Sequence, residues 1–374
     1  MGAPIILLSD PLIDDFGPGR VTVLLAQYFS ALRETSVVAP LISPEVETQL
    51  QGIGVEAVSL GQRPRAKTSS MVFVESWLRE ALFFRNSYAW KRGADGSHMV
   101  VNLSNCLVCE SHIWYMLGSV SDAIRAIVPN LSPVLQFGVR PLIPLIKLID
   151  SKQILSSSRK SSIHVACSLT CRRAYERLRI PIDDVIYPPI DTSLFHPSAE
   201  RPTEAYCLTY LGKETRFDCL YELASAGVEI LAFGAKFQGL PRELLSHPRV
   251  HHLGKVDNRT LVDLYSNAKF TAVPLSTEPF GYVPVESMAC GTPVLTLDRE
   301  GPSETVLNGQ TGWTAASDEM FVRLGERIWK AFSVPESMRR ACRKRALEFS
   351  VENVGKKWIQ WLERLPSHGR ATSG

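Results

Sequence analysis

Short apolar runs alternate with amphipathic segments along most of the chain, and this alternation limits the fold more than any other feature. The first series of expected strands comprises Pro4–Ser9, Thr35–Leu41, Val55–Leu60, Met99–Leu103, His112–Leu117 and His164–Ser168. The second comprises Tyr206–Leu211, Val228–Gly234, Val250–Leu253, Phe270–Leu275 and Pro293–Leu297. Helical spacing recurs between them, near residues 70–90, 119–129, 169–178, 217–226 and 259–267. Repeated strand and helix predict an α/β protein with doubly wound sheets.

The length of the chain predicts two domains. With 374 residues, it exceeds the size at which one hydrophobic core keeps growing. The stretch "VIYPPIDTSLFHPSAERP", residues 185–202, is rich in Pro and Ser and is the best linker candidate. Ligands of open α/β sheets bind at the carboxyl ends of the strands, so we expect the ligand site in a cleft between the two domains.

The composition is that of an ordinary globular protein, with 45% hydrophobic and 21% charged residues and a net charge of +3. A charge this small gives no reason to expect a nucleic-acid partner. The first apolar run, Ile5–Leu8, is too short for a secretory signal, and no run reaches the 18 or so residues that span a bilayer. We therefore expect a cytoplasmic protein.

The eight cysteines show no paired framework. Cys106 and Cys109 form a CxxC and Cys167 and Cys171 a CxxxC, but no second pair or His-x-His spacing accompanies them. Zinc or redox chemistry is the alternative to buried or loop thiols in a reducing cytosol. We expect thiols and no metal site.

The stretch "EPFGYVPVESMACGTPVL", residues 278–295, carries the clearest chemistry. A helix is expected from Pro284 to Cys290, closed by Gly291 in a left-handed cap. The free amides at its start form an anion site, and Glu278 and Glu286 lie on either side of them. Amides suit phosphates and carboxylates suit sugar hydroxyls, so the stretch predicts a site for a nucleotide-sugar.

A second candidate loop lies near the start of the chain, at Gly17-Pro18-Gly19. Its glycines follow an expected strand and precede an expected helix, so a ligand could approach the backbone there. The dinucleotide fingerprint fails, because Thr22 stands in place of the third glycine. The loop, with Arg20 beside it, is either a phosphate or acceptor contact or a plain tight turn.

The stretch "PLSTEPFGYVPVESMACGTPVLTLDREGPSETVLNGQTGW" closely resembles the donor-site signature of GT-B glycosyltransferases of family 4, the glycosyl transferases group 1. Other segments match in the same order: "VACSLTCRRAYERL", "VIYPPIDTSLF", "HHLGKVDNRTLVDLYSNAKF" and "ALEFSVENV". The resemblance covers most of the chain from about residue 180 onward and is weaker before it.

The resemblance implies the GT-B fold, in which two Rossmann-like domains face a central cleft and a C-terminal helix crosses back to the first domain. The expected parts are an acceptor-binding domain at 1–190, a linker at 191–202, a nucleotide-sugar-binding domain at 203–345, and a C-terminal helix and tail at 346–374.

The resemblance also assigns roles to residues. It implies that Glu286 binds the ribose and that Glu278 contacts the transferred sugar, against the plain alternatives of a helix-dipole acid and a solvated loop acid. The turn implied to hold the sugar and diphosphate comprises Phe280, Gly281, Tyr282 and Val283, with Gly212 also at the donor. The cations implied to neutralise the leaving diphosphate are Lys213, Arg216 and Lys236, although "YLGKETRF" departs from the usual spacing. Surface ion pairs are the alternative for Arg216 and Lys236.

The implied reaction moves a hexose, of the glucose or mannose type, from a UDP-, GDP- or ADP-linked donor with retention of configuration. Neither a bound metal nor another cofactor is expected, because positive charge and oriented amides stabilise the departing diphosphate. That phosphate can itself take the acceptor's proton. The implied acceptor is a hydroxyl of a glycan or of a lipid-linked molecule.

The acceptor side is less well defined. The family often places a histidine at the end of one strand, but "SHIWYMLG" has His112 at its start, so Tyr115 or Gly118 is expected at that place. A helical stripe of Phe73, Trp77, Ala81, Phe84 and Tyr88 lies near Arg79, Arg85, Lys91 and Arg92, and "VRPLIPLIKLI" follows at 139–149. These are either core or a surface that meets the membrane.

Two other classes of function stay open. A sugar-nucleotide epimerase or a phosphorylase on the same fold would need its own acid and base pair. A non-catalytic nucleotide-sugar-binding protein would tolerate replacement of Lys213 and Glu278.

Overall fold

The structure is a computed structural model in which residues 3–13, 17–66, 69–83, 98–198, 202–235, 237, 239–331 and 333–365 are described. The chain divides into two compact units. Unit 1 comprises Met1–Ser121, Pro144–Pro189 and Val351–Gly374, and unit 2 comprises Asp122–Ile143 and Ile190–Ser350. Each unit holds one parallel sheet, so the predicted pair of Rossmann-like α/β domains is confirmed.

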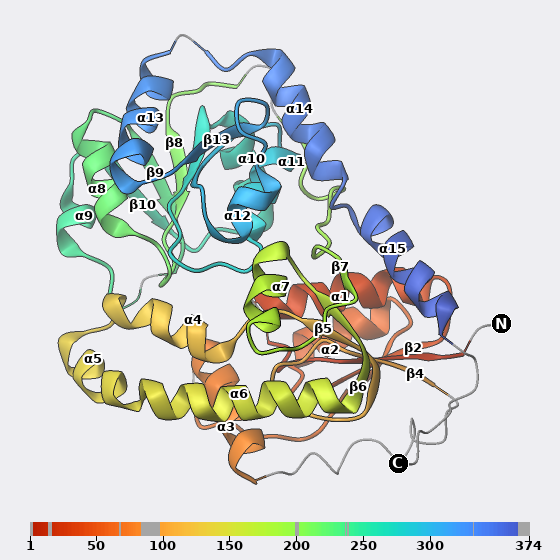
Figure 1. Cartoon of the computed structure of the whole chain (residues 1–374). Coiled ribbons are helices and arrows are strands. Elements are labelled where there is room, and N and C mark those ends of the chain that lie inside the picture. Colours follow the sequence, from red (N-terminus) through yellow and green to blue (C-terminus); the bar gives the residue numbers. More distant parts are fainter. Residues whose placement is uncertain are drawn as a thin grey trace. The chain divides into compact units, whose positions relative to one another are not determined.

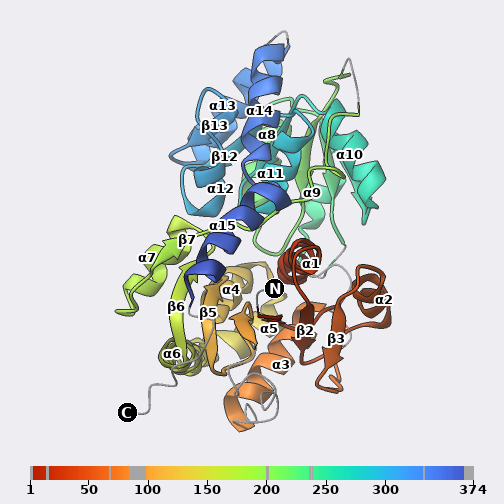
Figure 2. The same ribbon diagram turned by 90° about the vertical axis from the view of Figure 1, so that its right-hand side faces the viewer.

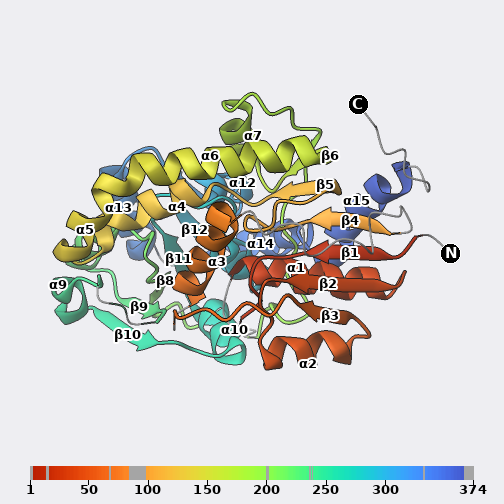
Figure 3. The same cartoon turned by 90° about the horizontal axis from the view of Figure 1, so that it is seen from below.

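Unit 1 is built on a seven-stranded sheet in the order β3-β2-β1-β4-β5-β6-β7, and Figure 3 shows β3 to β6 side by side in this order. The strands are β1 (Ile5–Leu8), β2 (Thr35–Ala39), β3 (Glu56–Ser59), β4 (Met99–Asn102), β5 (Ser111–Met116), β6 (Ser161–Ala166) and β7 (Asp184–Val185). All pairs are parallel. The order reverses between β1 and β4, which is the switch point where α/β sheets bind ligands.

The helices of unit 1 connect these strands. They are α1 (Gly17–Ser30), α2 (Pro44–Gly52), α3 (Ser69–Phe83), α6 (Ile143–Lys160) and α7 (Leu169–Glu176). In Figure 2, α2 lies beside β3 and α1. Ser43 caps α2 and Ser168 caps α7 by accepting a backbone N–H with the side chain, which satisfies an otherwise unpaired donor at each helix start.

Unit 2 has a six-stranded parallel sheet in the order β10-β9-β8-β11-β12-β13. Its strands are β8 (Cys207–Tyr210), β9 (Ile230–Phe233), β10 (Val250–Gly254), β11 (Phe270–Val273), β12 (Val294–Leu297) and β13 (Gly312–Ala315). Its helices include α8 (Phe217–Ser225), α9 (Arg242–Ser246), α10 (Asn258–Asn267), α11 (Tyr282–Ala289), α12 (Glu300–Thr305), α13 (Asp318–Lys330) and α14 (Glu336–Leu347). α8 packs against α13, and α11 packs against α10, α12 and α14 (Figure 1).

The central strands owe their place to composition. β1, β4, β11 and β12 are buried at every position. Strands covered by helices on both faces are apolar throughout rather than alternating. The apolar runs in the sequence therefore located these strands to within a few residues.

The last helix, α15 (Val351–Arg364), packs on α1 within unit 1, as the GT-B fold requires. Trp358 is fully buried with its ring edge on Tyr115, at a centroid distance of 5.0 Å. Trp361 donates from Nε1 to Asp184 Oδ2 at 2.7 Å. Gly355 lies directly against the ring of Tyr28, where a Cβ atom would overlap it. The predicted return of the C-terminal helix to the first domain is confirmed.

Part of the first half of the sequence belongs to unit 2. The segment Asp122–Ile143 joins that unit although its neighbours on both sides lie in unit 1. It holds most of α4 (Val120–Ile127), then the 3-10 turn η2 (Val128–Asn130), α5 (Pro133–Val139) and the turn η3 (Arg140–Leu142). The predicted helix near 119–129 covers only its beginning.

We expect Gly355→Ala to lower the free energy of unfolding by about 1 to 3 kcal/mol, because the new methyl group overpacks the contact between α15 and α1. Chemical denaturation followed by circular dichroism would measure it. Gly52→Ala is the control, since a Cβ at residue 52 meets nothing within 4 Å. Equal midpoints for both variants would contradict the packing.

Candidate functional site

Two loops meet at the switch point of unit 2. β8 and β11 are neighbours in the sheet, and the chain leaves their carboxyl ends through residues 211–216 and 274–281. The loops pair through an antiparallel bridge between Thr215 and Leu275, and the N–H of Arg216 donates to the carbonyl of Pro274 at 2.8 Å. Lys213 and Glu278 are thereby brought to the same edge of one sheet.

Glu278 lies at the centre of this edge. Its Oε1 accepts from the N–H of Gly281 at 3.1 Å and of Phe280 at 3.4 Å. Burial, together with the nearby acids Glu214 and Glu300, raises the pKa of this carboxyl to about 7. A carboxyl with this pKa exchanges its proton near neutral pH, so it can either donate to or accept from a sugar hydroxyl.

The turn before α11 offers backbone rather than side chains. Gly281 caps the helix with a φ of 85°, and a Cβ there would come within 2.9 Å of Pro302, so only glycine fits. Phe280 is buried with its ring against Tyr282 and Phe349. The helix begins at Tyr282, two residues before the predicted start at Pro284, and Gly291 takes the predicted left-handed cap with a φ of 82°.

Glu286 is the fifth residue of α11 and only 2% exposed. Its Oε2 accepts from the hydroxyl of Tyr265 at 3.1 Å. The carboxyl is thus held in one orientation from α10. A carboxylate fixed in this way can accept hydrogen bonds from a pair of hydroxyl groups, such as those of a ribose.

The predicted cations differ in their surroundings. Lys213 is partly exposed and makes no ion pair within the described residues. Arg216 is the N-cap residue of α8, and its guanidinium forms an ion pair with Asp318, which also binds Arg299 at 2.9 Å. Lys236 lies outside the described residues. Of the two cations that the structure describes, Lys213 is therefore the one without an ion pair.

Gly212 requires a correction. Its N–H donates to Thr215 Oγ1 at 2.9 Å, so it is not offered to a donor phosphate in this conformation. The glycine is needed for space instead, because a Cβ would overlap the carboxyl of Glu214 and the ring of Tyr210. Gly212 thus shapes the loop that carries Lys213.

Glu214 is the acid that sequence reasoning missed. Its carboxyl lies against Gly212 and close enough to Glu278 to raise that residue's pKa. The pKa of Glu214 itself is raised, because the effect of burial outweighs the opposing effect of Lys213. The signal was present, since Glu214 directly follows Lys213. The sheet edge formed by residues 211–216 and 274–281 is therefore more acidic than the motif implied.

In unit 1, the predicted glycine loop is the beginning of a helix. α1 starts at Gly17, so Gly17-Pro18-Gly19 is its first turn and not a loop before it. Gly19 is buried, and a Cβ there would come within 3.1 Å of Leu12. Arg20 follows on the same turn and is partly exposed. Asp14 and Asp15 lie outside the described residues.

Tyr115 is corrected from an acceptor residue to a core residue. It is 1% exposed, and its hydroxyl donates to the carbonyl of Ile186 at 2.6 Å. The reason is strand alternation, which turns this side chain toward the sheet's covered face and onto Trp358. His112 is partly buried with Nδ1 accepting from the N–H of Val100 at 3.1 Å, and burial lowers its pKa.

Asp10 marks the switch point of unit 1 and was not predicted. It follows β1, and its Oδ1 accepts from Ser104 Oγ at 2.6 Å and from the N–H groups of Asn105 and Cys106 at 2.9 Å. Burial raises its pKa. The carboxyl fixes the loop after β4 to the end of β1, which stabilises the edge where this sheet would take a ligand.

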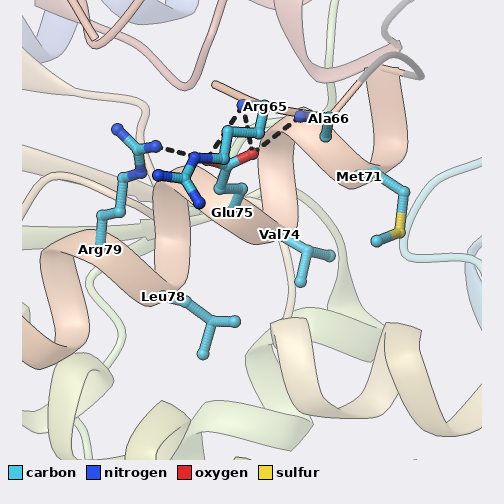
Figure 4. Close-up of a pocket in the computed structure, with 7 residues that line it drawn as sticks. All are labelled: Arg65, Ala66, Met71, Val74, Glu75, Leu78 and Arg79. Atoms are coloured by element: carbon cyan, nitrogen blue, oxygen red, sulfur yellow. Dashed lines mark hydrogen bonds and ion pairs between the residues drawn. The ribbon is translucent and has the colours of Figure 1, made fainter. Parts of the chain in front are cut away.

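A cavity of about 450 Å³ lies along the outer face of α3, as Figure 4 shows. Its apolar wall is formed by Met71, Val74 and Leu78. At its rim the Glu75 carboxylate accepts from the N–H of Ala66 at 3.0 Å and pairs with Arg79. Trp77 of the predicted stripe is fully buried, which fits the core alternative at this position. Phe84, Arg85, Tyr88, Lys91 and Arg92 lie outside the described residues.

The chain has eight cysteines. All eight cysteines are buried free thiols. Burial raises the pKa of Cys106 far above its ordinary value, with Asp10 adding to the effect. Within the described ranges, no group of three or more His, Cys, Asp or Glu side chains is arranged to hold a metal ion.

The family comparison agrees with the site just described. Residues 234–349 match the family described as glycosyl transferases group 1. The matched segment includes Glu278, the turn at Gly281 and Glu286, but it begins after Lys213 and Arg216.

The curated relatives are similar over parts of their length. The chain is 30% identical over 118 residues to an alpha-1,3/1,6-mannosyltransferase alg-2 of Neurospora crassa, covering 30% of this chain and 25% of that protein. It is 26% identical over 267 residues to a D-inositol 3-phosphate glycosyltransferase of Mycolicibacterium smegmatis, covering 62% of this chain and 57% of that protein. The chain thus spans 57% or less of the length of these two relatives.

Solved structures match over nearly the whole chain. Anabaena Alr3699/HepE in complex with UDP has a TM-score of 0.69 at 15% identity, covering 96% of this chain and all of that one. Sucrose-phosphate synthase from Thermosynechococcus elongatus has a TM-score of 0.69 at 18% identity, covering 97% and 98%. The fold is that of GT-B glycosyltransferases.

We expect the stability of the protein to fall as the pH rises through the titration of Glu278. The unfolded chain releases this proton near 4.5 and the folded protein near 7, so the folded state binds more protons between these values. Stability from this group is therefore present below about pH 4.5 and lost toward about pH 7.

Glu278→Gln removes the titration, so the melting temperature of the wild type should fall relative to that of the variant between about pH 5 and about pH 8. Thermal melts across this range would measure it. Glu352→Gln, at an exposed position of α15, is the control and should keep the wild-type slope. Parallel pH profiles for the wild type and Glu278→Gln would contradict the raised pKa.

Proposed function

We propose that the protein is a retaining glycosyltransferase of family 4 that moves a hexose from a nucleotide-diphosphate sugar to a hydroxyl group. The observation that carries the proposal is the pairing of two loops at one sheet edge, one carrying Lys213 and the other leading to Glu278 and the amide-rich turn. Support also comes from the match of residues 234–349 to glycosyl transferases group 1 and from neighbours whose structures hold UDP or UDP-glucose.

The residues divide the work by charge. In this proposal Lys213 neutralises the leaving diphosphate, and the amides at the start of α11 orient toward its oxygens. Glu278 binds hydroxyls of the hexose and Glu286 binds those of the ribose. Because Glu278 now holds the N–H groups of Phe280 and Gly281, donor binding has to exchange some of these hydrogen bonds for bonds to the ligand.

The step needs no nucleophile from the protein. The bond between the sugar C1 and the phosphate oxygen breaks, and its electron pair stays on the diphosphate. The acceptor oxygen forms a bond to C1 from the same face, and its proton moves to the leaving phosphate. The chain's own contribution is positive charge and orientation, which lower the barrier as charge develops on the diphosphate.

The donor proposal is tested by a thermal-shift panel of UDP-, GDP- and ADP-sugars, because a ligand of the native state raises the melting temperature. With the donor that binds, Lys213→Ala should lower kcat/KM about 100-fold, the size expected for one lost electrostatic contact to the leaving group. Lys344→Ala, at an exposed position of α14, is the matched control. A panel without any shift, or full activity of Lys213→Ala, would sink the proposal.

We propose further that the acceptor is lipid-linked and that two helices, each taken within its own unit, can meet a membrane: α5 of unit 2 and α6, nearly all of which lies in unit 1. α5 has no buried residue; Val134 is 81% and Phe137 is 85% exposed. On α6 the outer face carries Leu145, Leu148 and Leu155, while the inner face buries Asp150.

The polar residue on the inner face is satisfied. Asp150 Oδ2 accepts from Ser119 Oγ at 2.7 Å and from the N–H of Ser121 at 2.9 Å. The solvent side of α6 is therefore the apolar one, with Lys147 and Lys152 exposed among the leucines. Apolar side chains interleaved with lysine suit the interface of an anionic bilayer. Among the described residues, no helix is long and apolar enough to cross a membrane.

We expect the wild type to sediment with vesicles that contain anionic lipid and a Val134→Glu/Phe137→Glu variant to stay largely in solution. Leu32→Glu, which changes another exposed apolar residue, should behave as the wild type. The bound fraction measured by co-sedimentation gives the answer. Equal binding of the wild type and the double variant would rule out α5 as a membrane-binding helix.

A further inference from the structure

Asn130 ends the turn η2 of the segment Asp122–Ile143 and reaches the loop that carries Lys213. Its Nδ2 donates to the carbonyl of Lys213 at 2.6 Å and to the carbonyl of Thr215 at 3.1 Å. We propose that Asn130 is a positioning residue for the donor diphosphate, acting through this loop. The proposal rests on the proposed function, since it concerns the same donor.

The loop is held from two sides. Ser276, after β11, donates from its N–H and its hydroxyl to the carbonyl of Glu214, at 3.0 and 2.8 Å. Asn130 donates to the carbonyls of the residues on either side of Glu214, which are Lys213 and Thr215. Three successive carbonyls are thus satisfied, and these hydrogen bonds fix the peptide planes from which the Lys213 side chain leaves. Without Asn130, two of the three lose their protein donor.

Asn130 is itself held in place. Pro129 lies within η2 and fixes one backbone angle of the turn. Gln136, on α5, donates from Nε2 to the carbonyls of Pro129 at 3.0 Å and Leu131 at 2.9 Å, on both sides of Asn130. The carbonyl of Asn130 lies so close to Gly239 that a Cβ there would overlap it. The amide group therefore meets the loop from a rigid turn.

Position matters here because of the chemistry at the edge. Glu214 lies beside Lys213 and also acts on Glu278, so a lysine that moves by an ångström or two can pair with an acid instead of a phosphate. Arg216 is already occupied by Asp318, so it does not compensate in this conformation. A fixed backbone keeps the ammonium group of Lys213 in the place where the second phosphate of a nucleoside diphosphate would arrive.

The test compares two nucleotides that differ by one phosphate. Asn130→Ala removes the amide, and Asn130→Asp keeps the size of the side chain but lacks both N–H donors. We expect both variants to bind UDP roughly tenfold more weakly and UMP within about twofold of the wild type, measured by calorimetry. Where the panel selects another base, the matching diphosphate and monophosphate are used.

Asn308→Ala is the matched control. Asn308 also hydrogen-bonds to a backbone group, accepting from the N–H of Thr314 at 3.2 Å, but it lies before β13 at the amino edge of the sheet. Its affinities for UDP and UMP should equal those of the wild type.

Each outcome decides. A selective loss of UDP affinity in both Asn130 variants supports the proposal. Unchanged UDP affinity, or an equal loss of UDP and UMP affinity together with a lower melting temperature, overturns it and leaves Asn130 a structural residue. A wild type that binds none of the nucleoside diphosphates overturns the proposed function as well, which separates the two failures.

Discussion

The sheet edge where we propose that the donor binds depends on one pair of neighbouring strands. β8 lies next to β11 although about sixty residues separate them in sequence. The chain builds β9 and β10 on one side of β8 and then crosses back to add β11 on the other, so two loops leave the same end of the sheet without covering each other. Their pairing at Thr215 and Leu275 makes them one surface. Every candidate donor contact, from Lys213 to the amides of α11, depends on this reversal of strand order.

Much of the fold was predictable because buried parallel strands leave a strong mark on sequence. β1 is apolar at every position and β12 at all but Thr296, and a glycine cap such as Gly291 meets a local steric need. The exterior of α6 misled the same reasoning. Leu145, Leu148 and Leu155 are exposed while Asp150 and Gln153 are buried, so α6 lacks the pattern of a core helix and was not predicted.

Site residues were predictable where the chemistry is local and not where it depends on distant partners. The turn around Gly281 and the acid Glu278 stand in one short stretch, and the structure keeps them together. Arg216 is held by Asp318, 102 residues later, and Tyr115 is turned into the core by strand alternation and Trp358. Asn130 could not have been chosen from sequence, since it precedes Lys213 by 83 positions.

The placement of Asp122–Ile143 in unit 2 limits how this protein can be recombined with its relatives. A cut at Pro189, the obvious joint between the halves, would carry Asn130 away with the first half while Gly239 and the Lys213 loop stay with the second. A hybrid made there combines the Asn130 turn of one protein with the Lys213 loop of another, and the hydrogen bonds between the two segments need not form. Exchanging the first half between this protein and a relative therefore means leaving residues 122–143 with the second half.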